Sequence, residues 1–291
     1  MINEKYRVVL KKTMQIFDRL RVNKQALLDL IDEAELSESV YNSNAIENST
    51  LTLNETEQIL VECEVSRNIS IREVFEAKNL ARVSAYLKTK KEDPFNLDLI
   101  CLLHRMLLET IESSISGRLR EKDEFVRIGS YIAPSPDQLN DKMNKMIHDY
   151  HTNYDGFIVD KIARFHLEFE MIHPFCDGNG RIGRVLINFQ LMQAGFPKIT
   201  MRQKDKQQYF KAIKEYQDHQ STQLMEKLIF LALLESLHKR MTYLKGLNIV
   251  KLCNDAKKSQ LNVNTVLNKA KRQTIPAFRE KGVWKIGVEN E

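Results

Sequence analysis

The residues with the most evident chemistry lie in a twelve-residue stretch from His173 to Arg184, with the sequence HPFCDGNGRIGR. This stretch holds one imidazole, one carboxylate, three glycines and two arginines. Backbone N–H groups in a glycine-rich turn at the start of a helix bind anions, and phosphate suits such a turn. The stretch therefore predicts a phosphate-binding turn with a base beside it.

Two predicted helices flank this turn. Apolar residues recur at helical spacing from Ile158 to Ile172, and again from Ile182 to Met192. Pro174 predicts the end of the first helix, because proline lacks a backbone donor and disfavours helical geometry in the residue before it. The residues 177–180 therefore lie at the start of the second helix.

The charged residues of the stretch suggest distinct roles. Arg181 and Arg184 are three residues apart in the first turn, where guanidinium groups can bind phosphate oxygens in pairs. Two arginines at a helix start also oppose the helix dipole, which argues against a purely structural role. Asp177 is placed to bind Mg²⁺ together with phosphates, and His173 is the candidate general base for an incoming hydroxyl.

Other interpretations of the same residues need weighing. Residues 178–183 satisfy the dinucleotide pattern GxGxxG, but that fold requires a preceding strand and here a helix precedes it. No P-loop sequence occurs. His166, Glu170 and His173 share one helical face and form a candidate zinc site, although His166 and His104 also fit hydrogen-bonded core histidines. Phosphate binding without chemistry and a structural turn are the remaining alternatives.

The composition sets the broad class. The chain has 291 residues but only 10 glycines, and it is rich in leucine, isoleucine, lysine and glutamate, which predicts a mainly α protein. The net charge of +5 gives slight support to nucleic-acid binding. The four scattered cysteines, and a sequence with neither a signal peptide nor a membrane-spanning apolar run, predict a reduced cytoplasmic protein without membrane contact.

Two further segments stand out from the helical pattern. Residues 117–136 are rich in β-forming residues around Gly129-Ser130, which predicts a hairpin. In residues 37–52, Ser43 and Glu47 share one helical face and Asn48 is a plausible terminator, which taken alone describes an ordinary helix end. Helices are also predicted at residues 4–36, 54–62, 70–90, 97–111, 135–150, 204–216 and 222–243.

The stretch from His173 to Arg184 resembles the signature of the Fic (filamentation induced by cAMP) family, HPFx[DE]GNGRxxR, with every fixed position present. The resemblance extends over residues 40–240 and implies a helical domain that transfers AMP from ATP to a Ser, Thr or Tyr hydroxyl of a target protein. It implies that His173 deprotonates that hydroxyl and that Asp177 binds Mg²⁺. It assigns the remaining roles as follows: an anion hole of Gly178, Asn179 and Gly180, phosphate contacts of Arg181 and Arg184, and a core anchor at Phe175.

The same resemblance covers the target and the nucleobase. The predicted hairpin is similar to the family's flap, which aligns a target segment by main-chain pairing. The flap residues are Phe125, Val126, Arg127, Ile128, Gly129, Ser130 and Tyr131. Tyr209, Phe210 and Gln217 lie where relatives contact adenine, although the family often has asparagine at the position of Gln217.

The segment from Ser43 to Asn48 resembles the family's inhibitory motif, [ST]xxxE[GN]. It precedes the Fic core, as in the class whose inhibitory helix is N-terminal and in the same chain. The glutamate of that class pairs with the second arginine of the signature, so the resemblance implies that Glu47 occupies Arg184 and displaces the γ-phosphate. Some relatives also remove AMP with the same glutamate, and the sequence leaves the direction of the reaction open.

Residues 263–286 resemble the recognition helix and wing of excisionase-type helix-turn-helix domains. The matching positions are Thr265, Val266, Ile275, Pro276, Ala277, Arg279, Gly282 and Trp284, whereas Gln273 stands where such domains usually have glycine. The resemblance implies that Lys269, Lys271 and Arg272 approach DNA, with Arg279 and Lys285 at the phosphates. The alternative is a small helix-plus-hairpin lobe that supports the core.

These observations predict a mainly α protein in three parts: residues 1–95 with an inhibitory helix at 37–48, a Fic catalytic domain at 96–245, and a winged helix-turn-helix-like lobe at 246–291. The predicted function is an autoinhibited, Mg²⁺-dependent protein adenylyltransferase. The alternative is a DNA-binding regulator whose Fic core senses a nucleotide. The target protein, and the choice between a monomer and a homodimer, stay open.

Overall fold

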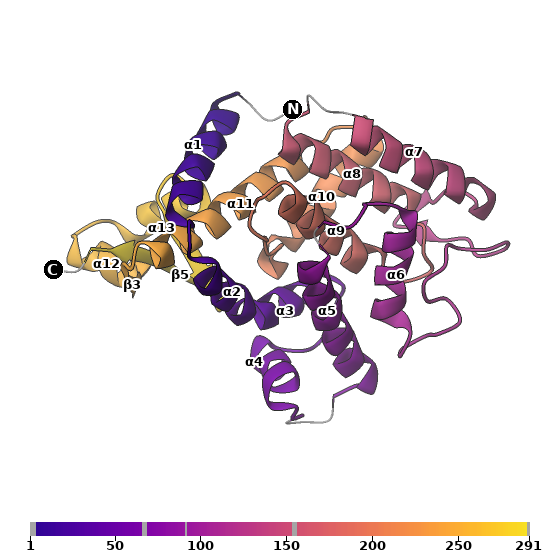
Figure 1. The fold of residues 1–291 in the computed structure, drawn as a ribbon, viewed down its shortest axis with the longest axis horizontal. Helices are drawn as coiled ribbons and strands as arrows, with labels where there is room; N and C mark the ends of the chain where they lie inside the picture. Colours follow the sequence, from indigo (N-terminus) through magenta and orange to yellow (C-terminus); the bar gives the residue numbers. More distant parts are fainter. Residues whose placement is uncertain (1–3, 66–68, 91, 153–155, 290–291) are drawn as a thin grey trace. The chain divides into compact units, whose positions relative to one another are not determined.

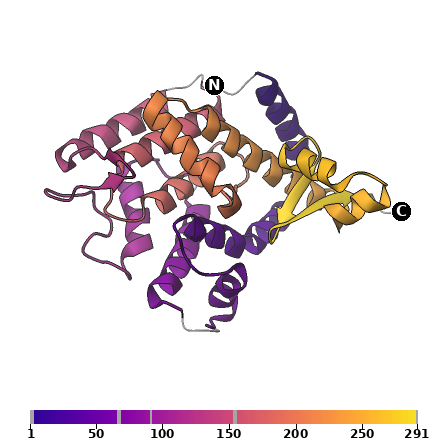
Figure 2. The same cartoon turned by 180° about the vertical axis from the view of Figure 1, so that it is seen from behind.

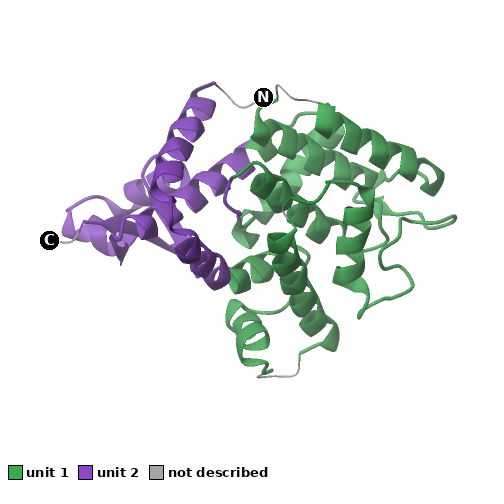
Figure 3. Ribbon diagram, in the orientation of Figure 1, with its two compact units in different colours: residues 1, 36–195, 200–226 green, residues 2–35, 196–199, 227–291 purple. Residues whose placement is uncertain are grey.

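The computed structural model describes residues 4–65, 69–90, 92–152 and 156–289, which form a mainly helical fold with one small hairpin and one small sheet (Figure 1). This confirms the predicted fold class. The contacts within the chain define two compact units (Figure 3). Unit 1 comprises Leu36–Gly195 and Thr200–Glu226, and unit 2 comprises Ile2–Glu35, Phe196–Ile199 and Lys227–Glu291. The three-part domain division stays a prediction.

Unit 1 is a bundle in which α8 packs between α7 and α9, and α5 packs against α3 and α6 (Figure 1). Its helices are α3 (Leu36–Ile46), α4 (Leu53–Glu57), α5 (Ile71–Thr89), α6 (Leu97–Leu108), α7 (Leu139–Thr152), α8 (Ile158–Ile172), α9 (Asn179–Gln193), α10 (Lys206–His219) and the start of α11 (Gln223–Leu244). A π-helical turn at Gln58–Glu62 continues α4, and 3₁₀ turns occupy Pro136–Gln138 and Gln203–Asp205.

The ends of these helices follow from local chemistry. Thr52 and Glu55 form a capping box at the start of α4, in which each side chain binds the other residue's backbone N–H. Asn48 adopts a left-handed φ of 70° just after α3, as its role of terminator requires. The core between the helices contains Phe95, Phe165 and Phe189, whose rings lie 5.0 to 5.7 Å apart around Phe95. Burying each ring contributes about 1.5–3 kcal/mol.

The predicted hairpin is present in unit 1. Strand β1 (Arg127–Ile128) pairs antiparallel with β2 (Tyr131–Ile132) around Gly129, which has a φ of 60°. Two large apolar side chains of this segment are exposed, Phe125 at 63% and Ile132 at 67%. A two-stranded ribbon with exposed apolar residues has free edges for pairing with another chain.

Unit 2 combines helices with a three-stranded antiparallel sheet (Figure 2). Its elements are α1 (Glu4–Leu20), α2 (Gln25–Ala34), most of α11, β3 (Asn248–Lys251), α12 (Leu252–Lys258), α13 (Val263–Lys271), β4 (Ala277–Glu280) and β5 (Val283–Val288). The strand order is β3-β5-β4, and β5 pairs with both neighbours. Leu252, Ala256, Val266 and Ala270 form a core between α12 and α13.

Gln273 shows why a residue other than glycine can follow α13. Its backbone is left-handed, with a φ of 53°, which a non-glycine residue adopts at some cost. The buried side-chain amide donates to the carbonyls of Ala270 and Ala277. Its oxygen lies 2.8 Å from Nδ1 of His238. These hydrogen bonds offset the backbone cost, because they satisfy carbonyls at the turn between α13 and β4.

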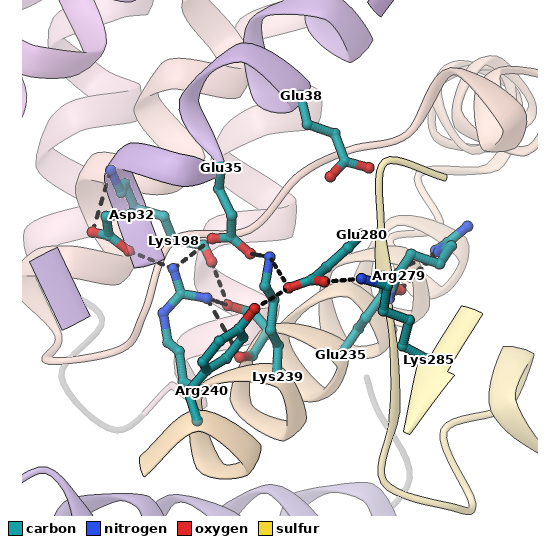
Figure 4. Close-up of polar contacts among 12 residues, drawn as sticks. Asp32, Glu35, Glu38, Lys198, Glu235, Lys239, Arg240, Arg279, Glu280 and Lys285 are labelled. Atoms are coloured by element: carbon teal, nitrogen blue, oxygen red, sulfur yellow. Dashed lines mark hydrogen bonds and ion pairs between the residues drawn. The ribbon is translucent and has the colours of Figure 1, made fainter. Parts of the chain in front are cut away.

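A network of buried charges connects α2, α11 and the sheet within unit 2 (Figure 4). Arg240 binds Asp32 at 2.5 Å and Glu35 at 2.7 Å. Lys239 binds Glu35 at 3.0 Å and Glu280 at 3.3 Å, and it thereby joins α2 to β4. Buried ion pairs persist where every charge has a partner. No helix among the described residues is long and apolar enough to cross a membrane.

Candidate functional site

The turn between α8 and α9 is held rigidly from within. His173 ends α8 in a left-handed conformation, with φ 48° and ψ 61°. Phe175 is fully buried, and its ring stacks on that of His104 at 3.7 Å. The Asn179 side chain accepts from the N–H of Phe175 at 2.9 Å and donates to its carbonyl at 2.7 Å. The first residue of α9 therefore fixes the loop that precedes it.

His104 is the hydrogen-bonded core histidine expected from the sequence. Its Nδ1 accepts from the N–H of Gly117, so Nε2 carries the proton and donates to the Asp177 carbonyl, both at 2.9 Å. Burial lowers the pKa of His104 to about 4, so the ring is neutral at pH 7. His104 therefore supports the turn through its hydrogen bond to Asp177 and its stacking on Phe175.

His173 has the protonation state that a general base needs. Its Nδ1 lies 3.3 Å from the Glu170 carbonyl, which can only accept, so the proton is on Nδ1 and the lone pair is on Nε2. Burial lowers the pKa of His173 to about 4. The ring is therefore neutral at physiological pH and can take a proton at Nε2.

The start of α9 attracts an anion. Gly178 caps the helix with a φ of 79°, a conformation that favours glycine. A Cβ at Gly180 would overlap the carboxylate of Glu47 and approach the guanidinium of Arg184. The Glu47 carboxylate thus already lies against the positive end of the helix dipole, where an anion is stabilised.

Arg184 is buried and bound on several sides. Its Nη1 lies 2.8 Å from the Glu47 carboxylate. Its Nε donates to the Ser43 hydroxyl at 3.0 Å, and its Nη2 donates to the Ser43 carbonyl at 2.8 Å. Tyr209 contacts the same guanidinium, with its ring centroid 5.7 Å away. The structure therefore brings Ser43 and Glu47 together with Arg184, which is far from both in the sequence.

Asp177 belongs to a closed ring of ion pairs. It binds Arg72 at 2.5 Å and Arg181 at 3.1 Å, and Glu76 binds Arg181 at 3.0 Å and Arg72 at 3.1 Å. Burial opposes ionisation of Asp177, but Arg181, the Gly178 N–H and Arg72 outweigh it and lower its pKa. A half-exposed carboxylate that stays anionic and already binds cations fits a Mg²⁺ ligand that shares the ion with phosphates.

The proposed zinc set does not form. His166 is fully buried, and its Nε2 lies 2.8 Å from the Tyr209 hydroxyl, which donates to Glu170 at 3.2 Å. Burial, followed by the charge of Glu47, raises the pKa of Glu170 to about 7. Within the described part of the chain, no group of three or more His, Cys, Asp and Glu side chains could hold a metal ion. The zinc alternative is therefore wrong, and His166 is a core histidine.

Arg120 is a component of the site that the sequence did not indicate. It is 3% exposed, and its guanidinium donates to four carbonyls: His173 at 2.9 Å, Glu124 at 2.8 Å, Pro134 at 2.8 Å and Ile172 at 3.4 Å. Its own N–H donates to the Pro174 carbonyl. Glu124 and Pro134 flank the hairpin, so one side chain joins both ends of the hairpin to the base.

A pocket of about 290 Å³ lies beside the site. It is lined by hairpin residue Tyr131, by Ile172 next to the base, and by Gln217 of α10. Phe210 is exposed and contacts Tyr209, which is itself buried against Arg184. Of the three residues linked to adenine by resemblance, the structure places Gln217 in the pocket and the two aromatic residues elsewhere.

The basic residues of α13 belong to unit 2. Lys269, Lys271 and Arg272 are exposed on that helix. Arg279 instead forms an ion pair with Glu235 at 2.7 Å and covers the Trp284 ring at 4.7 Å. Lys285 binds Glu280 at 2.5 Å. The two residues expected at DNA phosphates are thus engaged in contacts within unit 2.

Fold and site together define a class: a helical protein with an anion-binding helix start, a neutral histidine and a short hairpin beside it. Residues 94–191 match the model of the Fic/DOC family. The chain is 33% identical over 182 residues to "Protein adenylyltransferase Fic" of Nematostella vectensis. The matched region covers 60% of this chain and 42% of that protein. The chain thus spans less than half of the length of the curated relatives that it matches.

Solved structures share the fold. A Fic domain containing signaling protein from Bacteroides thetaiotaomicron has a TM-score of 0.73 and 25% identity, over 81% of this chain and 96% of that one. A Fic family protein from Desulfovibrio desulfuricans has a TM-score of 0.69 and 18% identity, over 100% of this chain and 98% of that one. The chain has a Fic-type fold and is a distant homologue of protein adenylyltransferases named Fic.

Proposed function

We propose that this chain transfers AMP from ATP to a hydroxyl group of a target protein, and that Glu47 restrains the transfer. The observation that carries the proposal is the neutral His173, with its lone pair on Nε2, in the turn that leads into the anion-binding start of α9. Distant homology to proteins named protein adenylyltransferase supports the reaction type.

The chemical step needs few groups. His173 takes the proton of the target hydroxyl at Nε2 while the hydroxyl oxygen bonds to the α-phosphorus, and the bond from that phosphorus to the bridging oxygen breaks to release pyrophosphate. The anion hole of Gly178, Asn179 and Gly180 stabilises the charge on the phosphate oxygens through the N–H groups of Asn179 and Gly180, because the Gly178 N–H is bound to Asp177. Asp177 would hold Mg²⁺, which when bound neutralises phosphate charge. Arg181 and Arg184 bind the outer phosphates.

The surroundings of the turn supply recognition. The pocket lined by Tyr131, Ile172 and Gln217 takes the adenine, and the Gln217 amide can both donate to it and accept from it. The hairpin of β1 and β2 pairs with the target's main chain, so the target adds a strand. The exposed Phe125 contributes apolar contact with the target.

Glu47 interferes with this arrangement in two ways. Its carboxylate occupies the guanidinium of Arg184, which the γ-phosphate needs, and it repels that phosphate. ATP then binds in a pose that is unsuited to in-line attack. A charge-assisted hydrogen bond contributes about 1.5–3 kcal/mol, so loss of the carboxylate changes productive binding by about one to two orders of magnitude.

The test is transfer of labelled AMP from ATP to the protein itself and to proteins of a cell extract. Glu47→Gly raises transfer by about 10- to 100-fold, and His173→Ala abolishes it in either background. Glu64→Gly, which removes an exposed carboxylate of the same unit, is the matched control and leaves transfer unchanged. A Glu47→Gly protein no more active than the wild type refutes the restraint, and transfer by His173→Ala refutes the base.

The direction of the reaction is tested with the same variants. In the reverse sense, Glu47 orients a water molecule that removes AMP from a modified target. AMP-labelled product from the Glu47→Gly reaction is purified and mixed with wild-type protein and Mg²⁺. Release of AMP by the wild type, but not by Glu47→Gly, assigns removal to Glu47, and no release by either leaves transfer as the activity.

A second candidate function, DNA binding by unit 2, is favoured by its charge. Residues 248–288 carry nine Lys and Arg residues against two acidic ones. In this proposal residues 246–291 form a winged helix-turn-helix lobe, α13 is its recognition helix, and Lys269, Lys271 and Arg272 contact DNA. The Fic core would then serve as a nucleotide sensor.

The DNA hypothesis is tested by a gel shift at increasing salt. A shift that weakens with salt, and that the charge reversals Lys269→Glu and Lys271→Glu abolish, supports it. Lys122→Glu, which reverses an exposed charge in unit 1, is the control. If the wild type gives no shift even at low salt, the lobe has only the supporting role.

A further inference from the structure

The ring of ion pairs around Asp177 includes two residues of α5, Arg72 and Glu76, that no function so far explains. The charges alternate: Arg72, Asp177, Arg181 and Glu76 each contact two neighbours of opposite sign, at 2.5 to 3.1 Å. Arg181 is 4% exposed and Glu76 is 14% exposed, whereas Arg72 is 53% exposed. Arg72 is thus the member of the ring that can move into solvent.

The two oxygens of Asp177 are bound differently. Oδ1 accepts from the Gly178 N–H at 2.6 Å and from Arg181 at 3.1 Å, so it belongs to the turn itself. Oδ2 accepts from Arg72 at 2.5 Å. A cation that binds Asp177 at Oδ2 therefore leaves the turn intact, but it must take the place of the Arg72 guanidinium.

Glu76 keeps both arginines at the site during such an exchange. It binds Nε of Arg72 and Nη1 of Arg181 through the same oxygen. An Arg72 that loses Asp177 retains its contact with Glu76, one helical turn away on α5. The exchange therefore removes one partly exposed ion pair, which is a small change in free energy.

We propose that Arg72 is a positioning residue that occupies the cation ligand Asp177 while the site is empty and competes with the divalent cation for Oδ2. This inference rests on the proposed nucleotide-binding function. Without a cation, Arg72 neutralises Asp177 and limits its repulsion of phosphate. When a cation binds, Arg72 must leave Oδ2 of Asp177. Its presence therefore weakens the dependence of nucleotide binding on the cation.

The test measures the affinity for AMPPNP, a non-hydrolysable ATP analogue, by calorimetry in Mn²⁺ and in EDTA. The readout is the affinity in Mn²⁺ divided by the affinity in EDTA. In Arg72→Ala the affinity in EDTA falls, because Asp177 is no longer neutralised, and the affinity in Mn²⁺ is maintained or rises. We expect the ratio to increase about two- to fivefold over the wild type, the size of one partly exposed ion pair.

Two controls separate charge from helix structure. Arg72→Lys retains a cation beside Asp177 and stays near the wild-type ratio. Arg82→Ala removes another arginine of α5, one that donates to the Met106 carbonyl, and does not change the ratio. A ratio in Arg72→Ala equal to or below that of the wild type overturns the inference. Lack of AMPPNP binding in every variant would instead refute the proposed function.

Discussion

The Glu47 carboxylate lies 2.8 Å from the Arg184 guanidinium, and the two residues differ sharply in exposure: 36% for the Glu47 side chain and 4% for that of Arg184. Helix α3, which ends at Ile46 just before Glu47, is held by other contacts. Glu38 pairs with Arg202 at 2.5 Å, and Asn42 accepts from the N–H of Gln203 at 3.0 Å. We therefore expect that Glu47 releases Arg184 by rotation of the Glu47 side chain, while α3 stays in place.

Ser43→Ala is expected to relieve the restraint only in part. The substitution removes the hydroxyl that accepts from Arg184 Nε but keeps the Ser43 carbonyl and the Glu47 carboxylate. Loss of one such hydrogen bond costs about 1 kcal/mol, so AMP self-transfer should rise about fivefold, well below the effect of Glu47→Gly. Ser39→Ala, a serine of the same helix, is the control. Equal activation by Ser43→Ala and Glu47→Gly would contradict the primary role of the carboxylate.

The activity of the Glu47→Gly variant is expected to be nearly constant between pH 5.5 and 8. A base must be unprotonated, and burial lowers the pKa of His173 to about 4, so transfer rises with pH through about 4 and is then level. An ordinary histidine, with a pKa of about 6.5, would retain about a tenth of its activity at pH 5.5. Initial rates across this range distinguish the two, and a tenfold loss between pH 7.5 and 5.5 would refute the assignment.

The parts that the sequence predicted share a physical basis. The turn from His173 to Arg184 was predictable because its base, carboxylate, glycines and arginines are contiguous and lie between two periodic segments. The ion pair of Glu47 with Arg184 joins residues far apart in the sequence, and it was expected only through a family resemblance. Periodicity and capping describe neighbours along the chain, so they carry no information about such pairs.

The contacts of Arg120 and Arg72 could not be predicted from the sequence. Arg120 binds backbone carbonyls, and a carbonyl belongs to every residue type, so no pairing pattern can indicate it. Arg72 meets Asp177 across 105 residues, from a helix whose own pattern explains its charges as an exposed face. Only the packing of α5 against the start of α9 brings these groups together.

Arg120→Met is expected to lower AMP transfer at least tenfold while AMPPNP affinity stays within about twofold. The loss of four carbonyl contacts frees the hairpin ends and the His173 backbone, and a misplaced base slows the chemical step more than it weakens binding. Arg118→Met, which loses an ion pair to Glu124 on the same loop, is the matched control. Normal transfer by a folded Arg120→Met protein would contradict this role, and Arg120→Lys tests whether a single donor suffices.

Arg240→Ala is expected to destabilise unit 2 by about 3–5 kcal/mol at pH 7, because it removes a buried guanidinium and leaves the partly buried Asp32 and Glu35 without their main partner. Arg272→Ala, an exposed arginine of α13, should change the free energy of unfolding by less than about 0.5 kcal/mol. Urea unfolding measures both.

The cost of Arg240→Ala should shrink in acid. Burial opposes ionisation of Glu35, but Arg240 and Lys239 outweigh it and lower its pKa. A carboxyl group with a lowered folded pKa stabilises the fold above its unfolded pKa, about 4.5, and loses that contribution as the pH falls through the folded value. Without Arg240, Glu35 favours its protonated form. Acid therefore lowers the free energy of unfolding of the wild type more than that of the variant. Urea unfolding should show that the difference in free energy of unfolding between the wild type and Arg240→Ala is smaller at pH 4 than at pH 7. A difference that does not change with pH would mean that Arg240 acts through packing alone.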